Sequence, residues 1–387
     1  MGRMADYLIE TIAQFQRGHL TRRELLERGA ALSLAGAGLA ALGAINPVAG
    51  QDRFMRPAIR AAAHQENETL KVALVTAQRT GDLGPVDAMV AGMEQGAEDL
   101  NYETNVIEVV QGEYTEAVRA VAASGTDLII AAFPPLIDAV VEVAPQYPDQ
   151  HFSLIIGETP EVIPNVMSFW ELGLEACYLT GALAGLYSSS STVGAVIATR
   201  NPEQDRFIAG YQQGVKSTNR EATFLFNVIG GERPFEDPAT AKRLALVLNE
   251  QGADVVMGSG GQSIQGVHEA AEESSGAFVS TGLDTDQCLL RPASTLATAR
   301  IYEGNMVYRA MKAKRDGAWE AGNYLLGIND GGEDICTFDN STPPEHLDPQ
   351  VGHEIGPELP LEMREFIWNL RQQVIAGEIV IENKVAE

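Results

Sequence analysis

The stretch Leu70-Lys71-Val72-Ala73-Leu74-Val75 decides the fold class, because a short run rich in aliphatic and β-branched residues predicts a buried strand. A helical pattern follows from about Pro85 to Leu100, and residues 105–110 again have the pattern of a strand. Each apolar run is bounded by Gly, Pro or Asp, which is typical of parallel βαβ units. The sequence therefore predicts an α/β fold built on parallel sheets.

The alternation continues along the chain and divides into two series of similar size. The first series is completed by helices over 116–123 and 136–144 and by strands over 127–133 and 151–156. In the second series Asp237 is expected to cap a helix that begins at Pro238. The remaining strands are predicted over 167–170, 192–198, 223–229, 253–257, 277–283, 295–301, 324–328 and 379–381. The remaining helices are predicted over 172–187, 205–216, 306–314 and 361–375, and one more follows the strand over 253–257 and ends at Ala271. Two such series indicate two doubly wound lobes, whose ligands bind beyond the carboxyl ends of the strands.

The composition describes a folded chain with a strong acidic excess. Hydrophobic residues make up 45% of the 387 residues and charged residues 21%, which is typical of globular proteins. The length fits two domains with extensions. The 53 acidic residues against 27 basic ones give a formal net charge of −26, which argues against a nucleic-acid partner because phosphate binding needs a basic surface.

The first fifty residues have the outline of an export signal. Arg22-Arg23 precedes a run of small and apolar residues from Gly29 to about Val48, which is the arrangement of a twin-arginine signal. Residues 51–67 are polar and are expected to form a flexible spacer. The sequence does not fix a cleavage site, so an uncleaved anchor and an amphipathic regulatory helix stay open as alternatives.

The cysteines and histidines refine this picture. Cys177, Cys288 and Cys336 are the only cysteines, and none lies beside the apolar run. We therefore expect no lipid anchor, since a lipoprotein needs a cysteine directly after its signal. An odd count gives no complete disulfide framework, and the sequence leaves open whether Cys288 and Cys336 pair. The six histidines have no ligand spacing, so no metal site is expected.

Enzyme motifs are missing from the sequence. The turn Gly258-Ser259-Gly260-Gly261 suggests a dinucleotide loop, but Ser263 stands where the third glycine would be. A tight turn that lets a ligand approach the backbone is the simpler interpretation. Without a Walker lysine, a nucleophile elbow or paired Cys or His motifs, we expect neither catalysis nor a cofactor.

Ordered motifs connect the chain to a known family. The run from Leu174 to Ala184 follows the pattern E-x-x-Y-L-x-G-x-x-A from Glu175, and Phe235-Glu236-Asp237-Pro238 and the run from Thr281 to Gln287 follow in order. This set resembles the basic membrane protein (BMP) family of ABC-transporter solute-binding proteins. The resemblance implies a type I periplasmic-binding fold, with two lobes joined by a multi-strand hinge. It also implies a small ligand held between the lobes and transporter membrane subunits as partners.

The resemblance also implies a binding site for a purine nucleoside. Phe235 matches one of the two aromatic residues that sandwich the base in well-understood members. Asp284 matches an acid proposed to bind the ribose hydroxyls, and Asp82 matches an acid in the first loop. The other expected ligand-binding residues lie at strand ends or match weaker motif positions: Phe133 and Trp170 as replacements for a lost ring, Gly260, Asp286, and Arg300 in place of a lysine.

Two departures bear on the ligand. The family's first-loop aromatic and the Asn after it fall on Pro85-Val86, and an aspartate usual at the end of the fourth strand falls on Ile156. A sugar or another non-purine solute therefore stays open as an alternative. Packing roles are also open: Phe235 and Trp170 fit a core, and Asp284 and Asp286 fit a hinge turn.

The expected organisation is a signal segment at 1–50, a spacer at 51–67, lobe 1 at 68–163 plus 288–325, and lobe 2 at 164–287 plus 326–387. The expected protein is an exported, monomeric solute-binding protein that closes about its hinge when a ligand contacts both lobes. A ligand-sensing receptor or regulator domain of the same fold, and a secreted enzyme, are the rival classes. Cytosolic location with an intact N-terminus would favour a regulator, and turnover of a nucleoside would favour an enzyme.

Overall fold

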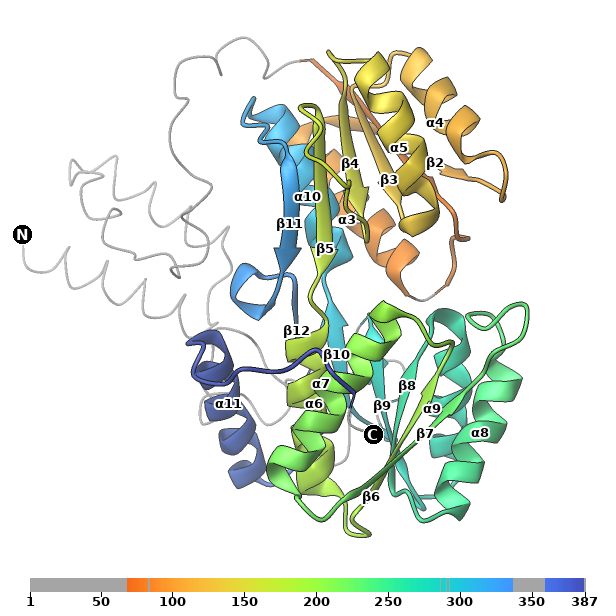
Figure 1. Cartoon of the computed structure of the whole chain (residues 1–387), viewed down its shortest axis with the longest axis vertical. Helices are drawn as coiled ribbons and strands as arrows, with labels where there is room; N and C mark the ends of the chain where they lie inside the picture. Colours follow the sequence, from red (N-terminus) through yellow and green to blue (C-terminus); the bar gives the residue numbers. More distant parts are fainter. Residues whose placement is uncertain are drawn as a thin grey trace, which may run out of the picture. The chain divides into compact units, whose positions relative to one another are not determined.

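The computed structural model describes residues 68–336 and 359–385, except residues 83, 286, 290 and 292. It contains two six-stranded sheets with helices on both faces (Figure 1). The predicted α/β class with two doubly wound sheets is confirmed. The expected signal segment (1–50) and spacer (51–67) lie outside the described residues, as does most of the stretch between 336 and 360.

The first sheet forms the core of lobe 1 and has the strand order β11-β5-β4-β3-β1-β2, with every pair parallel. Its strands are β1 (Leu70–Thr76), β2 (Tyr102–Glu108), β3 (Leu128–Ala132), β4 (His151–Ile155), β5 (Val166–Glu171) and β11 (Gly322–Leu326). Successive strand residues point to opposite faces. Leu74 therefore packs with helices α3 (Pro85–Leu100) and α10 (Glu303–Arg315), whereas Val75 packs with α4 (Tyr114–Ala123) and α5 (Ile137–Val143).

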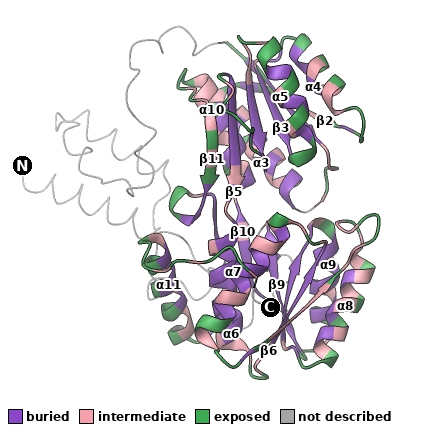
Figure 2. Cartoon of the chain, in the orientation of Figure 1, coloured by how far each residue is buried: buried purple, intermediate pink, exposed green. Residues whose placement is uncertain are grey.

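The second sheet forms the core of lobe 2 and has the order β12-β10-β9-β8-β6-β7, in which only β12 is antiparallel to its neighbour. Its strands are β6 (Thr192–Ile197), β7 (Thr223–Val228), β8 (Val255–Ser259), β9 (Val279–Asp284), β10 (Thr295–Ile301) and β12 (Glu333–Ile335). Helices α6 (Leu174–Tyr187) and α7 (Pro202–Thr218) cover one face, and α8 (Pro238–Glu250) and α9 (Ile264–Glu273) cover the other. Figure 2 shows that the buried residues follow the strands of both sheets.

Short elements complete the described chain. Helix α11 (Leu361–Ile375) packs against α6. Single 3₁₀ turns lie at Pro134–Leu136, Ala144–Gln146, Gly261–Ser263, Gln287–Leu289 and Ile328–Asp330. None of the helices in the described ranges combines the length and apolar character needed to cross a bilayer.

Two glycines allow α6 and α7 to pack closely. A Cβ atom at Gly181 would come 2.1 Å from the carbonyl oxygen of Tyr211, and one at Gly214 would come 2.0 Å from that of Tyr178. The glycine of the E-x-x-Y-L-x-G pattern is therefore required by a helix crossing, where any side chain would force the two backbones apart.

Most predicted elements are present, and several have the predicted bounds. The helix over 85–100, the strand over 295–301 and the helix over 361–375 are confirmed. The cap is also confirmed, because the Asp237 side chain accepts a hydrogen bond from the Thr240 backbone N–H at 2.9 Å. The strand predicted over 379–381 is wrong: Ile379 and Ile381 pack against the core without joining a sheet. An isolated apolar triplet fits both outcomes, since only a neighbouring strand makes it a strand.

Sheet membership differs from the expected lobe boundaries at two strands. β5 lies between β4 and β11 in the first sheet, although it falls in the range 164–287 expected for lobe 2. β10 lies in the second sheet, although it falls in the range 288–325 expected for lobe 1. An apolar pattern indicates that a strand is buried, but it does not say which neighbours it pairs with. The chain therefore passes between the lobes after β5, after β10 and after β11.

Candidate functional site

The carboxyl ends of the second sheet's strands meet the first turn of α7. Asn201 caps this helix by accepting a hydrogen bond from the Gln204 backbone N–H at 2.8 Å. The Gln204 side chain in turn accepts one from the Ser259 hydroxyl, at the end of β8, at 2.8 Å. This is the edge at which open α/β sheets bind ligands.

Five carboxyl groups gather near this edge, and we call them the carboxylate cluster: Asp82, Glu171, Glu203, Asp284 and Glu303. Asp284 ends β9 and is 7% exposed. Burial, followed by the negative charges of Glu203 and Asp82, raises its pKa to about 7. Asp82 follows β1 in lobe 1, so the cluster joins carboxyl groups from both lobes.

Two of the lobe 1 members, Glu171 and Glu303, lie where the chain passes between the lobes. Glu171 ends β5 and Glu303 begins α10, and each is 1% exposed. Burial is the main reason that the pKa of each is raised well above its usual range, and neighbouring carboxylates add to it. Glu203 lies close enough to Glu171 for their charges to interact, and burial also raises the pKa of Glu203.

Trp170 and Arg206 lie beside the cluster. The Arg206 guanidinium lies 5.8 Å from the centroid of the Trp170 ring, within cation–π range. Nε1 of Trp170, and Nε and Nη2 of Arg206, are buried without a hydrogen-bond partner in the described part of the chain. Buried donors are normally paired, so these atoms are available to a bound molecule.

Asp82 has a local role in addition to its place in the cluster. Its carboxylate accepts hydrogen bonds from the backbone N–H groups of Gly84, Val86 and Asp87 at 2.9, 3.1 and 3.2 Å. It therefore fixes the start of α3, and these hydrogen bonds offset part of the burial that raises its pKa.

Phe235 and Gly260 lie together on the lobe 2 edge. Phe235 is half-buried before α8, and its carbonyl accepts a hydrogen bond from the Ser263 N–H at 3.2 Å. Gly260 has φ 147°, and a Cβ there would lie 2.6 Å from the Cβ of Ala198. The close approach that requires this glycine is thus to the end of β6, within the protein itself.

Phe133, Arg300 and Asp286 are placed differently. Phe133 follows β3, is 5% exposed and belongs to the hydrophobic core. Arg300 lies opposite Asp284 in the β9–β10 register, and its guanidinium is 5.0 Å from the centroid of the Tyr302 ring. It also lines a cavity of about 470 Å³ between α3 and α10. Asp286 lies outside the described residues.

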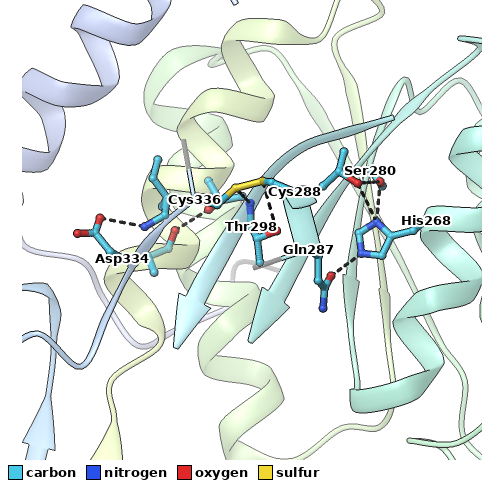
Figure 3. Close-up of a disulfide and its surroundings, with 11 residues drawn as sticks. His268, Ser280, Gln287, Cys288, Thr298, Asp334 and Cys336 are labelled. Atoms are coloured by element: carbon cyan, nitrogen blue, oxygen red, sulfur yellow. Dashed lines mark hydrogen bonds between the residues drawn. A yellow bond between two sulfur atoms is a disulfide. The ribbon is translucent and has the colours of Figure 1, made fainter. Parts of the chain in front are cut away.

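A disulfide between Cys288 and Cys336 holds the turn that carries Asp284 (Figure 3). The Gln287 side chain donates to the Leu283 carbonyl at 2.8 Å and points toward His268. The pairing that the sequence left open is therefore present, and the turn after β9 is fixed at both ends. Cys177 is buried and unpaired.

Sequence reasoning missed Glu171, Glu203, Arg206 and Glu303. Glu203 lies in the stretch after a predicted strand where ligands were expected, but a glutamate in the first turn of a helix is also a normal helix-stabilising residue. Glu171 and Glu303 sit at segments between the lobes, and those segments are defined only once sheet membership is known. Within the described ranges, no group of three or more His, Cys, Asp or Glu residues could hold a metal ion.

Known proteins similar to this chain agree with the fold. The Bmp family, described as PnrA-like ABC transporter substrate-binding proteins, matches residues 69–345. An uncharacterised lipoprotein of Pyrococcus abyssi is 26% identical over 328 residues, which cover 78% of this chain and 80% of the relative. Basic membrane protein A1 of Borrelia garinii subsp. bavariensis is 23% identical over 322 residues, which cover 82% of this chain and 89% of the relative.

Solved structures confirm the type I periplasmic-binding fold that the sequence predicts. An ABC transporter solute-binding protein from Aeropyrum pernix has a TM-score of 0.70 at 24% identity, over 81% of this chain and 94% of that one. One from Conexibacter woesei has a TM-score of 0.64 at 20% identity, over 81% and 99%. The family match spans most of the described chain and agrees with the ordered motifs of the sequence. This chain therefore belongs to the Bmp family of PnrA-like ABC transporter substrate-binding proteins.

Proposed function

We propose that this chain captures a purine nucleoside, or a related purine, between its lobes outside the cytoplasm and delivers it to the membrane subunits of an ABC importer. Membership of a substrate-binding family supports a small-molecule ligand and transporter partners. The observation that carries the proposal is that half-buried Asp82 of lobe 1 and buried Asp284 of lobe 2 lie close enough for their charges to interact. A ligand bound there contacts both lobes at once.

The chemistry of the cluster suits a sugar-bearing ligand. An ionised carboxylate accepts strong hydrogen bonds from adjacent hydroxyl groups, so Asp284 is assigned to the ribose. Phe235 is assigned to the base, since it is half-buried at the same sheet edge. Trp170 offers a second ring and an unpartnered Nε1 donor. Gly260, Phe133, Asp286 and Arg300 complete the proposed site.

Hinge closure is the proposed mechanism. Ligand contacts from both lobes favour the closed form over the open one, and the transporter recognises the closed form. The proposal includes no catalytic step and no cofactor, and the protein acts as a monomer. The Cys288–Cys336 disulfide supports export, because disulfides persist in oxidising compartments. The Pyrococcus relative is named a lipoprotein, whereas the proposal for this chain involves no signal cysteine.

Calorimetric titration of the protein with adenosine, inosine and guanosine tests the proposal. Micromolar or tighter binding, about −8 kcal/mol, is expected for at least one of them. Phe235→Ala should lower that affinity at least about tenfold, the low end for a lost stacking contact. Phe366→Ala, at an exposed position of α11, is the matched control and should leave the affinity unchanged.

Two results would contradict this proposal. If calorimetry detects no heat of binding for nucleosides, nucleobases or sugars, the assignment of a purine nucleoside as the ligand is wrong. Unchanged affinity in Phe235→Ala would make Phe235 a packing residue and move the base to another ring.

A further inference from the structure

The charges around the candidate site do not balance. The carboxylate cluster contains five acidic groups, from the loop after β1, the end of β5, the first turn of α7, the end of β9 and the start of α10. Glu333 on β12 adds a further negative charge near Glu171. When all of these carboxyl groups are ionised, their negative charges outnumber the positive charge of Arg206, which acts on Glu171 and Glu203, even if Arg300 on the neighbouring strand is added.

Two of these carboxyl groups also lack hydrogen-bond donors. Oε2 of Glu171 and Oε2 of Glu303 are buried and have no partner in the described part of the chain. Both side chains are 1% exposed, so bulk water does not solvate them. Their charges interact with each other and with Asp284, which places both within the cluster. Buried acceptors in folded proteins are normally satisfied, and a bound molecule that donates hydrogen bonds would satisfy these two.

We infer that the solute held between the lobes is an organic cation, whose positive charge the carboxylate cluster neutralises. This inference rests on the proposed binding role of the site, and it does not depend on the purine. It narrows the ligand class to a small molecule with a protonated amine or a quaternary or ring nitrogen. A neutral nucleoside satisfies two carboxylates through its hydroxyl groups and leaves the remaining charges unmatched.

The geometry favours an organic cation over a bare metal ion. No group of three or more potential ligands is close enough together to hold a metal within the described ranges. The acidic groups instead come from five separate segments of both lobes, which suits contacts to a molecule larger than a metal ion. Burial of the cluster favours binding of a cation, because charge interactions strengthen where water is excluded.

Binding of a cation should release protons. The pKa of Asp284 is about 7, so this group is partly protonated at neutral pH in the ligand-free protein, and burial raises the pKa values of Glu171, Glu203 and Glu303 as well. A positive charge at the cluster favours the ionised carboxylates, and the displaced protons pass to the buffer. The measured binding enthalpy should therefore change with the ionisation enthalpy of the buffer.

Matched pairs of probes separate charge from shape. Each pair is titrated into the full chain near neutral pH: choline with its neutral isostere dimethylbutanol, putrescine with butanediol, and N1-methyladenosine with adenosine. The cation of at least one pair should bind at least about tenfold more tightly than its neutral partner and release protons. Equal or tighter binding of every neutral partner overturns the inference.

Charge-removing variants locate the effect. Glu303→Gln keeps the shape of the side chain and should lower affinity for the bound cation at least about tenfold, with little effect on its neutral partner. Glu250→Gln, exposed on α8, is the control. Glu203→Gln serves the same purpose if the Glu303 variant does not fold. Loss of stability with unchanged cation affinity in both variants overturns the inference.

The outcomes also separate this inference from the proposed function. Binding of adenosine without binding of any cation contradicts only the inference. Binding of choline or putrescine without any nucleoside supports the inference and replaces the purine. If the protein is folded and binds none of the six compounds, both the inference and the proposed function are contradicted.

Discussion

Three strand ends adopt a backbone conformation that large side chains rarely occupy. Phe133 after β3, Ile156 after β4 and Asp284 at the end of β9 have φ angles of 79°, 58° and 78°. Residues with a Cβ are held in this region only where the surrounding structure fixes them, and such positions gather at functional sites. The direction of the Asp284 carboxylate is thus set by the turn that carries it, before any ligand arrives.

His268 gives a pH dependence at the scale of one residue. It is 1% exposed, and its Nδ1 lies 2.8 Å from the Ser280 hydroxyl while Nε2 contacts Gln287. Burial lowers its pKa from 6.5 to about 4. The unfolded chain therefore takes up the proton first, so the stability contributed by neutral His268 is complete above about pH 6.5 and is lost as the pH falls toward 4.

We expect the free energy of unfolding of the native protein to fall, relative to that of His268→Gln, by about 3 kcal/mol across this window. Urea unfolding of both proteins at several pH values measures the difference. Comparing the two proteins cancels the opposite contribution of the buried carboxyl groups, whose raised pKa values act in the other direction. A constant difference between the two proteins would contradict the prediction.

At the scale of elements, the short strand β12 is held from two sides. Asp334 accepts hydrogen bonds from Arg371 of α11, at 3.0 and 3.1 Å from Nε and 2.6 Å from Nη2, and both side chains are buried. The disulfide joins the end of the same strand to the turn after β9. A three-residue edge strand has few ladder hydrogen bonds, so these contacts fix its position.

Removing the disulfide should destabilise the protein measurably. The bridge closes a loop of 48 residues, which restricts the unfolded chain by about 4 kcal/mol. The double variant Cys288→Ser with Cys336→Ser should therefore lose about that much free energy of unfolding. Dithiothreitol should lower the stability of the native protein and leave the variant unchanged. If the reductant affects both proteins equally, the bridge is not the cause.

The elements themselves follow from sequence, but their partners do not. Leu70–Thr76 and Pro85–Leu100 have local patterns strong enough to fix a strand and a helix. The sequence predicts β5 and β10 as strands. The sheet that each strand joins depends on its pairing with β4 or β9, and no local sequence pattern encodes this pairing. The same limit applies to the site: Asp284 was found from a motif, whereas Glu171 and Glu303 join it only through the crossings between the lobes.

At the scale of the whole molecule, Trp170 reports on the relation between the lobes. It lies on β5 of lobe 1, while the Arg206 guanidinium that faces its ring comes from α7 of lobe 2. Closure on a ligand changes the surroundings of a ring placed between two lobes. Trp170 is therefore the natural probe of the hinge motion.

A variant with Trp319→Phe and Trp368→Phe leaves Trp170 as the only tryptophan. Its emission should shift when a ligand identified by calorimetry is added, with the same midpoint as the binding isotherm. Trp170→Phe, which keeps the other two tryptophans, should show little change. A ligand that binds without altering Trp170 emission would argue against closure at this site.

The three crossings between the lobes also constrain how the chain is made. The first sheet needs β11 at residues 322–326, and the second needs β12 at 333–335. Neither sheet is therefore complete until nearly the whole polypeptide has left the ribosome. Neither lobe can complete its sheet during synthesis before the C-terminal strands have been made. Truncation at the middle of the chain should therefore yield two incomplete sheets instead of one folded lobe.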